Sequence, residues 1–262
     1  MTRRRIEQMR IVVSGASSGI GWHLALELAR RGARLVVSAR RDERLQSLAE
    51  QIRESGGECH VLAGDVTDGD LRENLISKAV ELLGGIDGIV NCAGIGAMGR
   101  FDQANADRLR AIFEVNFFAT AELIRLAIPH LKSGRKPIIV NISSVLGHRA
   151  VPLKSEYCAS KFAIHGLSDS LRAELKPDGI DVLLVSPSTT DSEFFDSAIE
   201  GANDRDWKGR KAMPPERVAN IAVRAIRMGR SEVIISLGGT LLVWLDRISP
   251  PLANYLIAKF SR

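Results

Sequence analysis

Short apolar runs alternate with longer amphipathic segments through the first half of this 262-residue chain. The expected strands are residues 10–14, 34–38, 59–63 and 87–91, and a helical pattern follows each of them. Strands that are joined by helices form parallel sheets, because parallel neighbours need a long crossover connection. The pattern therefore predicts an α/β fold with a doubly wound parallel sheet, whose ligand lies at the carboxyl ends of the strands.

The turn after the first expected strand is rich in glycine and reads Gly-Ala-Ser-Ser-Gly-Ile-Gly. Such glycines permit a tight turn, a close approach of the backbone to a pyrophosphate, and close packing of helix on strand. The pyrophosphate would lie at a helix N-terminus, where free N–H groups and the helix dipole favour an anion. An ordinary strand–helix connection is the alternative. The candidate nucleotide-binding residues are Gly15, Ser17, Ser18, Gly19, Ile20 and Gly21.

The second expected strand ends in Ala39, Arg40 and Arg41, where the ribose of an adenosine would lie. An acidic residue there binds the 2′-hydroxyl of NAD, whereas arginine suits the 2′-phosphate of NADP. The two arginines could instead be solvated residues at the start of a helix. The missing carboxylate and the two cations together favour NADP as the cofactor.

Small and polar residues end the third and fourth expected strands. Asp65 could accept a hydrogen bond from an adenine amino group, or it could serve a turn or a helix cap. Asn91, Ala93 and Gly94 stand in the run Asn-Cys-Ala-Gly. Small residues there would let a cofactor lie close over the strand end.

Groups that can do proton chemistry together lie between residues 144 and 161. Tyr157 and Lys161 are four residues apart, so they share one face of a helix. An ammonium one turn away stabilises a phenolate and lowers its pKa from about 10 toward the neutral range. Ser144 adds a neutral donor at the end of a preceding strand. Asn116 lies in an apolar helix expected over 105–131, where an amide needs partners or belongs to a polar site.

Together these motifs resemble the short-chain dehydrogenases/reductases that have a Tyr-x-x-x-Lys active site. The resemblance covers roughly residues 10–195. It implies a single Rossmann-type domain and an oxidoreductase that interconverts a carbonyl and a secondary alcohol with NADP(H). The matching positions are Gly15-x-x-x-Gly19-x-Gly21, Asp65, Asn91-Cys-Ala-Gly94, Asn116, Ser144, Tyr157-x-x-x-Lys161 and Pro187.

The resemblance implies a role for each catalytic candidate. Tyr157 would be the general acid–base that protonates the carbonyl oxygen, and Ser144 would hydrogen-bond that oxygen. Lys161 would contact the nicotinamide ribose and depress the pKa of the tyrosine. Asn116 would hold a water in a proton relay behind the lysine.

The resemblance also assigns cofactor contacts outside the glycine turn. Arg40 resembles the basic residue of NADP-preferring members, and Val66 would flank the adenine. Pro187, Thr189 and Ser192 would lie beside the nicotinamide and the diphosphate. Two positions depart from the family pattern, because serine follows Pro187 where glycine is usual, and Ser192 replaces a threonine. Neither change removes a group that the mechanism needs.

Composition narrows the compartment and the partners. The net charge is +5, but the basic residues are spread out and no nucleic-acid recognition module accompanies them. Cys59, Cys92 and Cys158 occur singly, which disfavours disulfides and a metal site and fits a reducing compartment. The N-terminus lacks the apolar core of a signal peptide, and no run is long enough to span a membrane. We expect a cytoplasmic protein.

The sequence predicts one domain over 1–262, with three parts. Residues 10–190 would form the cofactor-binding and catalytic core, and 190–230 would form a substrate lid that carries Phe194, Phe195 and Trp207. The apolar tail 240–262 is broken by Pro250-Pro251. It could be a subunit interface in a homodimer or homotetramer, a shallow membrane contact, or part of the pocket wall.

Three functional hypotheses remain open at this stage. The first is the NADP(H)-dependent oxidoreductase acting on a small-molecule carbonyl or alcohol. The second is an NADP-binding regulator or scaffold without turnover, against which the set Asn116, Ser144, Tyr157 and Lys161 weighs. The third is a membrane-surface reductase of an apolar, lipid-like carbonyl.

Overall fold

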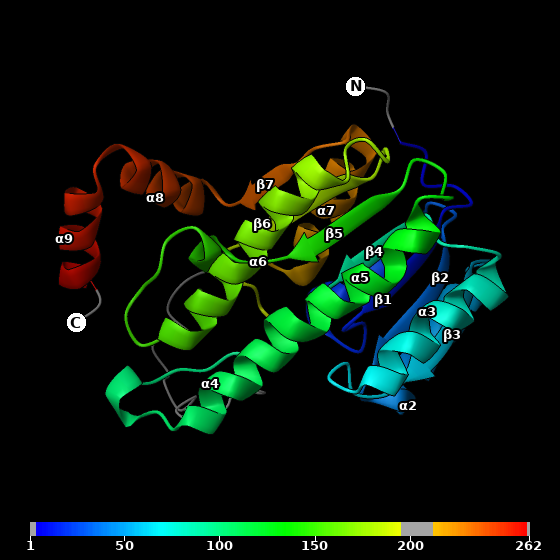
Figure 1. The fold of residues 1–262 in the computed structure, drawn as a ribbon, viewed down its shortest axis with the longest axis horizontal. Coiled ribbons are helices and arrows are strands. Elements are labelled where there is room, and N and C mark those ends of the chain that lie inside the picture. Colours follow the sequence, from blue (N-terminus) through cyan, green and yellow to red (C-terminus); the bar gives the residue numbers. More distant parts are fainter. Residues whose placement is uncertain (1–3, 195–211, 261–262) are drawn as a thin grey trace.

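The computed structural model describes residues 4–194 and 212–260. In these residues one parallel sheet has the strand order β3-β2-β1-β4-β5-β6-β7 (Figure 1). The doubly wound fold expected from the sequence is confirmed. The strands are β1 (Arg10–Ser14), β2 (Arg34–Ala39), β3 (Glu58–Ala63), β4 (Gly88–Asn91), β5 (Ile138–Ile142), β6 (Asp181–Pro187) and β7 (Glu232–Ile235).

Helices cover both faces of the sheet, so the strands are apolar on both sides. Helices α1 (Gly19–Ala29), α2 (Asp42–Glu54) and α7 (Pro215–Met228) pack on one face. Helices α3 (Gly69–Leu83), α5 (Ala119–Leu131) and α6 (Ser155–Glu174) pack on the other. Strand β1 shows the division, since Ile11 and Val13 belong to the first core and Val12 to the second.

The strand order reverses between β1 and β4, and the glycine turn lies at this point. Gly15 has φ +69°, and a Cβ placed on it would lie 2.5 Å from the backbone nitrogen of Ala93. Only glycine permits this contact between the turn after β1 and the chain after β4. Parallel sheets bind ligands at such a reversal.

The helix expected over 105–131 is divided by a π-helical segment. Helix α4 (Ala106–Phe113) leads into π-helical Glu114–Phe118, and α5 continues from it. Asn116 stands in the π-helical turn, where the helical ladder is widened. Such single π-turns occur often at functional sites.

Two terminal helices extend away from the sheet. After Ser236, whose hydroxyl accepts a hydrogen bond from Gly239 N and caps the helix, α8 (Leu237–Ile248) begins, and α9 (Pro250–Phe260) follows the break at Pro250. Both project from one end of the body (Figure 1). Within the ranges 4–194 and 212–260, none of the helices has the length and apolar character needed to cross a bilayer.

Candidate active site

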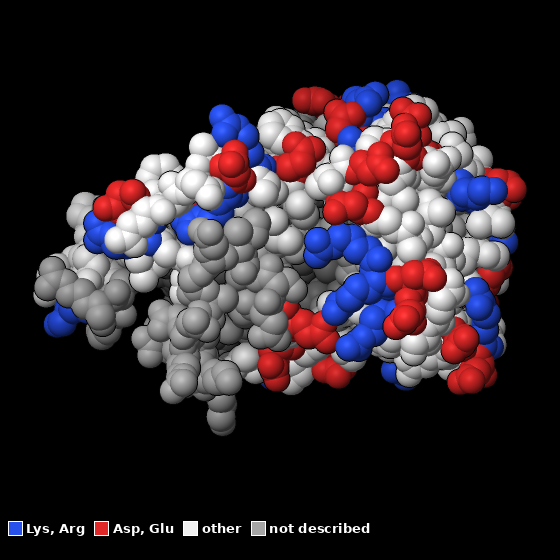
Figure 2. Space-filling view, turned by 90° about the horizontal axis from the view of Figure 1, so that it is seen from below, with Lys and Arg blue, Asp and Glu red and all other residues white. Residues whose placement is uncertain are grey.

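The candidate residues gather at the edge where the strands end. Figure 2 views this edge and shows basic side chains beside a hollow near the middle of the face. Elements that are far apart in the sequence meet there: the turn after β1, the chain after β4, the segment after β5, and the start of α6. The site is therefore assembled by the parallel topology, which brings all strand ends to one side.

The glycine turn is shaped so that no side chain fills it. A Cβ on Gly21 would lie 2.2 Å from the carbonyl oxygen of Gly15, and one on Gly19 would lie 3.1 Å from the Cβ of Ser192. Helix α1 begins at Gly19, and Ser18 precedes it with extended backbone and no side-chain cap. The first turn of α1 is therefore not capped by the Ser18 side chain, which suits an anion at this helix start. Cofactor contacts of Ser17, Ser18 and Ile20 stay a prediction.

Arg41 is the arginine that contacts the glycine turn. Its Nε lies 3.3 Å from Ser17 Oγ, and its Nη2 lies 3.4 Å from the carbonyl oxygen of Ser17. Its Nη1 donates to Glu193 Oε2 at 2.6 Å, and Arg44 lies 3.6 Å from the other oxygen of Glu193. Arg40, the residue favoured by the resemblance, is exposed at the end of β2. The structure therefore adds Arg44 to the basic group and brings Arg41 nearest the turn.

The Asp65 side chain stabilises a turn in this structure. Its Oδ1 accepts hydrogen bonds from the backbone nitrogen and the hydroxyl of Thr67, each at 2.9 Å. Val66 follows and packs partly against the core beneath α3. These contacts match the turn role that the sequence offered as an alternative for Asp65. A contact of Asp65 with adenine stays a prediction.

Tyr157 and Lys161 project from the first turns of α6 toward the ends of β4 and β5. Lys161 Nζ lies 5.7 Å from the centroid of the Tyr157 ring and donates to the carbonyl oxygen of Ile142 at 3.0 Å. The lysine is 5% exposed. Ser144, which follows β5, hydrogen-bonds the tyrosine hydroxyl and also accepts from Leu146 N at 3.1 Å. Its neighbour Ser143 turns instead toward Lys161 O.

Burial governs the protonation of this group. Desolvation raises the pKa of Tyr157, and the hydrogen bond from Ser144 opposes that rise. Burial lowers the pKa of Lys161 to about 8, and the pKa of the neighbouring Cys92 thiol rises to about 12 for the same reason. The tyrosine is a protonated donor at neutral pH in this geometry. A lysine effect that lowers the tyrosine pKa stays a prediction.

Asn116 joins the π-helical turn to the catalytic helix. It is 1% exposed, and its Oδ1 accepts from Ile95 N at 2.8 Å. Its Nδ2 donates to Ile95 O and to Ser160 Oγ, each at 3.0 Å, and Ser160 Oγ donates to Tyr157 O at 2.8 Å. The widened π-turn thus aims a buried amide at the backbone that carries the tyrosine. A bound water on this amide stays a prediction.

The remaining predicted residues line the same edge. A Cβ on Gly94 would lie 3.2 Å from Asn116 Oδ1 and 3.6 Å from Lys161 Nζ, so the backbone at Gly94 closes over the site. Asn91 is buried, and its Nδ2 donates to Asn141 Oδ1 at 2.8 Å. Pro187 ends β6, and the carbonyl oxygen of Thr189 accepts from Met213 N at 2.9 Å.

The first part of the expected lid reaches the tyrosine. The Phe194 ring meets the Tyr157 ring edge to face, with centroids 5.7 Å apart. Phe195 and Trp207, also predicted for the lid, lie outside the described residues. Sequence reasoning missed Glu193 and Arg44, because no spacing links them to the turn. It also missed Ser160, for which the signal was a small polar residue on the buried face of the mixed-polarity helix α6.

Comparisons with known proteins agree with this geometry. A family model described as short chain dehydrogenase matches residues 9–203. The 11-beta-hydroxysteroid dehydrogenase-like 4A of Arabidopsis thaliana is 34% identical over 96% of this chain and 83% of that protein. The dehydrogenase/reductase SDR family member 7B of Xenopus tropicalis is 31% identical over 92% of this chain and 81% of that protein.

Solved structures of short-chain dehydrogenases are also similar to this chain. A short chain dehydrogenase from Burkholderia cenocepacia in complex with NADP has a TM-score of 0.81 and 29% identity, and the match covers 90% of this chain and 100% of that chain. A short chain dehydrogenase/reductase from Burkholderia phymatum in complex with NAD has a TM-score of 0.87 and 24% identity, over 95% and 96% of the two chains. The second likeness supports the fold alone.

Proposed function

The chain belongs to the short-chain dehydrogenase family, and we propose that it is an NADP(H)-dependent oxidoreductase that interconverts a carbonyl and a secondary alcohol. The observation that carries the proposal is the grouping of Ser144, Tyr157 and Lys161 beside a glycine cradle. Tyr157 is protonated and hydrogen-bonded to Ser144, so it holds the proton that a carbonyl oxygen takes up on reduction. Burial raises its pKa, so we propose that the charge of Lys161 and the bound cofactor make it a stronger acid in the complex.

The residues at the strand ends fit a dinucleotide. Glycine at positions 15, 21 and 94 lets the segments at the strand ends pack closely, since a Cβ there would meet Ala93 N, Gly15 O or Asn116 Oδ1. The uncapped start of α1 favours phosphate. When bound, NADPH supplies the hydride that reduces the carbonyl carbon.

The chain's own groups handle the proton. Tyr157 gives its hydroxyl proton to the substrate oxygen as the alcohol forms, and Ser144 orients that oxygen by a hydrogen bond. Lys161, a buried cation near the tyrosine ring, offsets the negative charge that is left on the phenolate. Asn116 and Ser160 hold the first turn of α6 in place through the carbonyl of Tyr157.

We propose NADP rather than NAD because β2 ends without an acidic residue, and Arg41 and Arg44 follow it at the start of α2. Both arginines already hold a carboxylate, that of Glu193, in the manner in which they would hold a 2′-phosphate. Arg40 stands beside them and is exposed.

The test is a cofactor and substrate screen that follows the absorbance of reduced nicotinamide. NADPH and NADH are compared first, with a panel of small aldehydes, ketones and apolar, lipid-like ketones. Oxidation of NADPH that depends on one class of carbonyl supports the proposal. Tight NADPH binding with no turnover on any carbonyl or alcohol would favour the alternative, an NADP-binding regulator.

We infer that a second copy of this chain covers α8. Its exposed apolar residues are spaced by four, three and four positions, which is the spacing of a helix–helix seam. This seam consists of Leu237, Leu241, Trp244 and Ile248. A two-fold axis would pair it with the same helix of the second copy and give a homodimer.

Compartment and organisation complete the proposal. We propose a cytoplasmic protein, since Cys59, Cys92 and Cys158 are free thiols, which fits a reducing environment. We also retain the division into a core over 10–190, a lid and helices over 190–230, and the tail over 240–262. Attachment of that tail to a membrane surface is the alternative to a dimer seam.

A further inference from the structure

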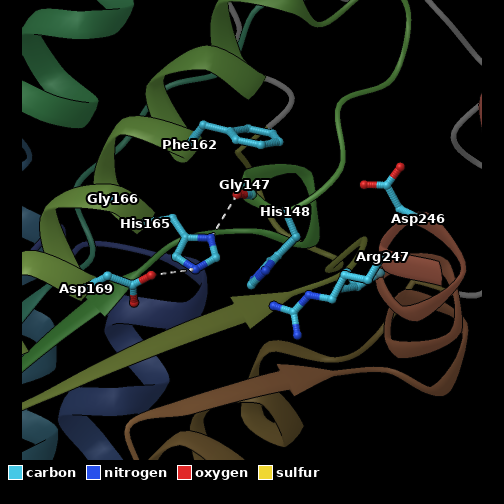
Figure 3. Close-up of a pocket in the computed structure, with 9 residues that line it drawn as sticks. Gly147, His148, Phe162, His165, Gly166, Asp169, Asp246 and Arg247 are labelled. Carbon is cyan, nitrogen blue, oxygen red and sulfur yellow. Dashed lines mark hydrogen bonds and ion pairs between the residues drawn. The ribbon is translucent and has the colours of Figure 1, made fainter. Parts of the chain in front are cut away.

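Two histidines from separate elements meet in a second pocket, away from the glycine turn. The pocket has a volume of about 370 Å³ and lies between α6, α8 and the short helix η3 (Val145–Gly147). Figure 3 shows His148 and His165 side by side, with Arg247 reaching toward them from α8. Their ring centroids are 4.4 Å apart. Neither ring belongs to the proton chemistry proposed above.

A carboxylate completes this cluster. Glu232, at the start of β7, has an oxygen 3.3 Å from His148 Nε2. His148, His165 and Glu232 each offer a ligand atom, and all three atoms lie within 4.8 Å of one another. A tetrahedral zinc ion with ligand bonds of about 2.0–2.1 Å holds its ligand atoms about 3.3 Å apart. One edge of the cluster therefore already has the length that zinc requires.

The hydrogen bonds of His165 leave one nitrogen free to bind a metal. Its Nδ1 lies 3.1 Å from the carbonyl oxygen of Gly147, and a carbonyl only accepts, so Nδ1 carries the proton. In the neutral ring Nε2 then presents a lone pair, and it faces Asp169 Oδ2 at 3.5 Å. Two electron-rich atoms at this distance call for a positive charge, which a second proton on the ring or a metal ion would supply. Metal-binding histidines commonly donate their other N–H to a backbone carbonyl in this way.

Unpartnered polar atoms are an independent sign that the cluster holds something more. Among the described residues, Glu232 Oε1, the oxygen that lies 3.3 Å from His148 Nε2, is buried without a hydrogen-bond partner, and the His148 side chain is only 2% exposed. His148 Nδ1 is unpartnered too, but it is not the nitrogen that faces Glu232. Buried polar atoms of this kind are uncommon, and each needs a water or an ion. Within the described part of the chain, Ser186 Oγ, 2.8 Å from His148 Nε2, is the neutral hydrogen-bond partner of that ring.

We propose that His148, His165 and Glu232 form a binding site for a divalent transition-metal ion of the zinc type. The carboxylate of Asp169 or a water would take the fourth position. Ser186 would turn its hydroxyl away from His148 when the metal binds. The ion would tie together the segment after η3, the middle of α6 and the strand β7, and so it would brace the base of α8 rather than take part in the reaction.

One positive charge in the pocket works against the binding of a cation. Arg247 lines the same pocket, and its guanidinium repels a cation. The carboxylates of Glu232 and Asp169 balance a divalent ion, so Arg247 is left as excess positive charge. Arg247→Met is therefore expected to strengthen zinc binding. The same substitution would weaken binding if the pocket took an anion instead.

The experiment uses the full chain without a histidine tag, stripped with a chelator and titrated with Zn²⁺ by calorimetry. We expect one ion per chain, with affinity lowered on the order of tenfold or more in His165→Gln and Glu232→Gln. His130→Gln, in the last turn of α5 and outside the pocket, is the matched control and should bind as the wild type does. Co²⁺ should give the visible absorption of a four-coordinate site in the wild type and not in His165→Gln.

Stability and anion binding provide the second readout. Zinc at a hundredfold excess over its Kd should raise Tm by roughly 5–10 °C in the wild type, and chelator should reverse the rise. All four variants, Arg247→Met, His165→Gln, Glu232→Gln and His130→Gln, should unfold like the wild type in chelator, which shows that they fold. Equal zinc affinity in the wild type and His165→Gln would overturn the proposal. So would stabilisation by inorganic phosphate but not by zinc, with its loss in Arg247→Met.

Discussion

Arg41 and Glu193 form an ion pair across the mouth of the glycine turn, with Nη1 and Oε2 2.6 Å apart. The arginine also contacts the carbonyl oxygen and the hydroxyl of Ser17, so it links β2, the turn and the segment after β6. The hydrogen bond from Arg41 lowers the pKa of the Glu193 carboxyl. The Glu193 side chain is therefore a carboxylate near neutral pH. This carboxylate would compete with a 2′-phosphate for the same guanidinium.

Glu193→Gln should therefore tighten NADPH binding without changing NADH binding. An exposed ion pair contributes about 0.2–1 kcal/mol, so the gain in NADPH affinity should be up to about fivefold. Fluorescence titration of both cofactors measures it. Equal tightening for NADH would mean that Glu193 acts on the shared part of the two cofactors.

Arg41→Ala should weaken NADPH far more than NADH. A hydrogen bond to a charged group is worth about 1.5–3 kcal/mol, which corresponds to a loss of roughly 10- to 100-fold. Arg40→Ala is the matched variant, one position away on the same strand end. A larger loss in Arg40→Ala than in Arg41→Ala would restore Arg40, the residue favoured by the family resemblance, as the main contact of the 2′-phosphate.

Tyr157→Phe should abolish most turnover and keep cofactor binding. Loss of a positioned general acid costs about 10²- to 10⁴-fold, and the phenyl ring preserves the edge-to-face contact with Phe194. The measurement is kcat for carbonyl reduction together with Kd for NADPH. Full turnover in the variant would show that another group supplies the proton.

The buried ammonium of Lys161 should leave a signature in stability against pH. Its folded pKa, about 8, lies below the ordinary value of 10.5 because burial disfavours the charge. Between these values the unfolded chain binds more protons, so the free energy of unfolding rises with pH from 8 to 10.5, by about 3 kcal/mol for this group. Below pH 8 the folded protein bears the full free-energy cost of burying the charged Lys161 ammonium.

Lys161→Met isolates that contribution up to pH 10, because the neighbouring Cys92 thiol, with a pKa of about 12, stays protonated in the folded chain. Relative to the wild type, the Lys161→Met variant should have its largest advantage in the free energy of unfolding at pH 7. This advantage should shrink as the pH approaches 10.5, because the wild type gains stability over that range. Urea titrations at pH 7, 8, 9 and 10 give the curve. A difference that does not change with pH would mean that the lysine is not depressed in the folded protein.

A buried ion pair fixes the helix that carries the tyrosine. Arg108 Nε and Nη2 both donate to Glu156 Oε1, at 3.0 and 2.6 Å, and the two side chains are 5% and 1% exposed. Arg108→Met should cost about 3–5 kcal/mol, since it leaves a buried carboxylate unpaired. Adding Glu156→Leu should recover most of this loss, because a well-packed apolar pair replaces both charges. Chemical denaturation of the two variants decides the point.

The fold could be predicted, and candidate site residues could be named, because both depend on short-range patterns. Apolar runs and a glycine turn specify a buried strand and a tight connection, and a spacing of four places Tyr157 and Lys161 on one face. The pair of Arg41 and Glu193 could not be found, since 152 positions separate the two residues and either could have pointed to solvent. The cluster of His148, His165 and Glu232 escaped for the same reason. The π-turn at Asn116 escaped too, because its 3.6-residue apolar pattern continues through the insertion.

The seam on α8 gives the last prediction, which concerns assembly. If Leu241 and Trp244 are covered by a second copy, burying such side chains contributes about 1.5–3 kcal/mol each to the dimer. Leu241→Glu with Trp244→Glu should therefore weaken dimerisation by at least about a hundredfold and leave the monomer folded, since both positions are exposed in one chain. Leu82→Glu, the same kind of change at an exposed leucine of α3, is the control. Sedimentation equilibrium over micromolar concentrations measures the effect.

The seam would belong to a membrane surface instead if two results were found together. The wild type would stay monomeric, and it would float with liposomes while a chain ending at Gly239 did not.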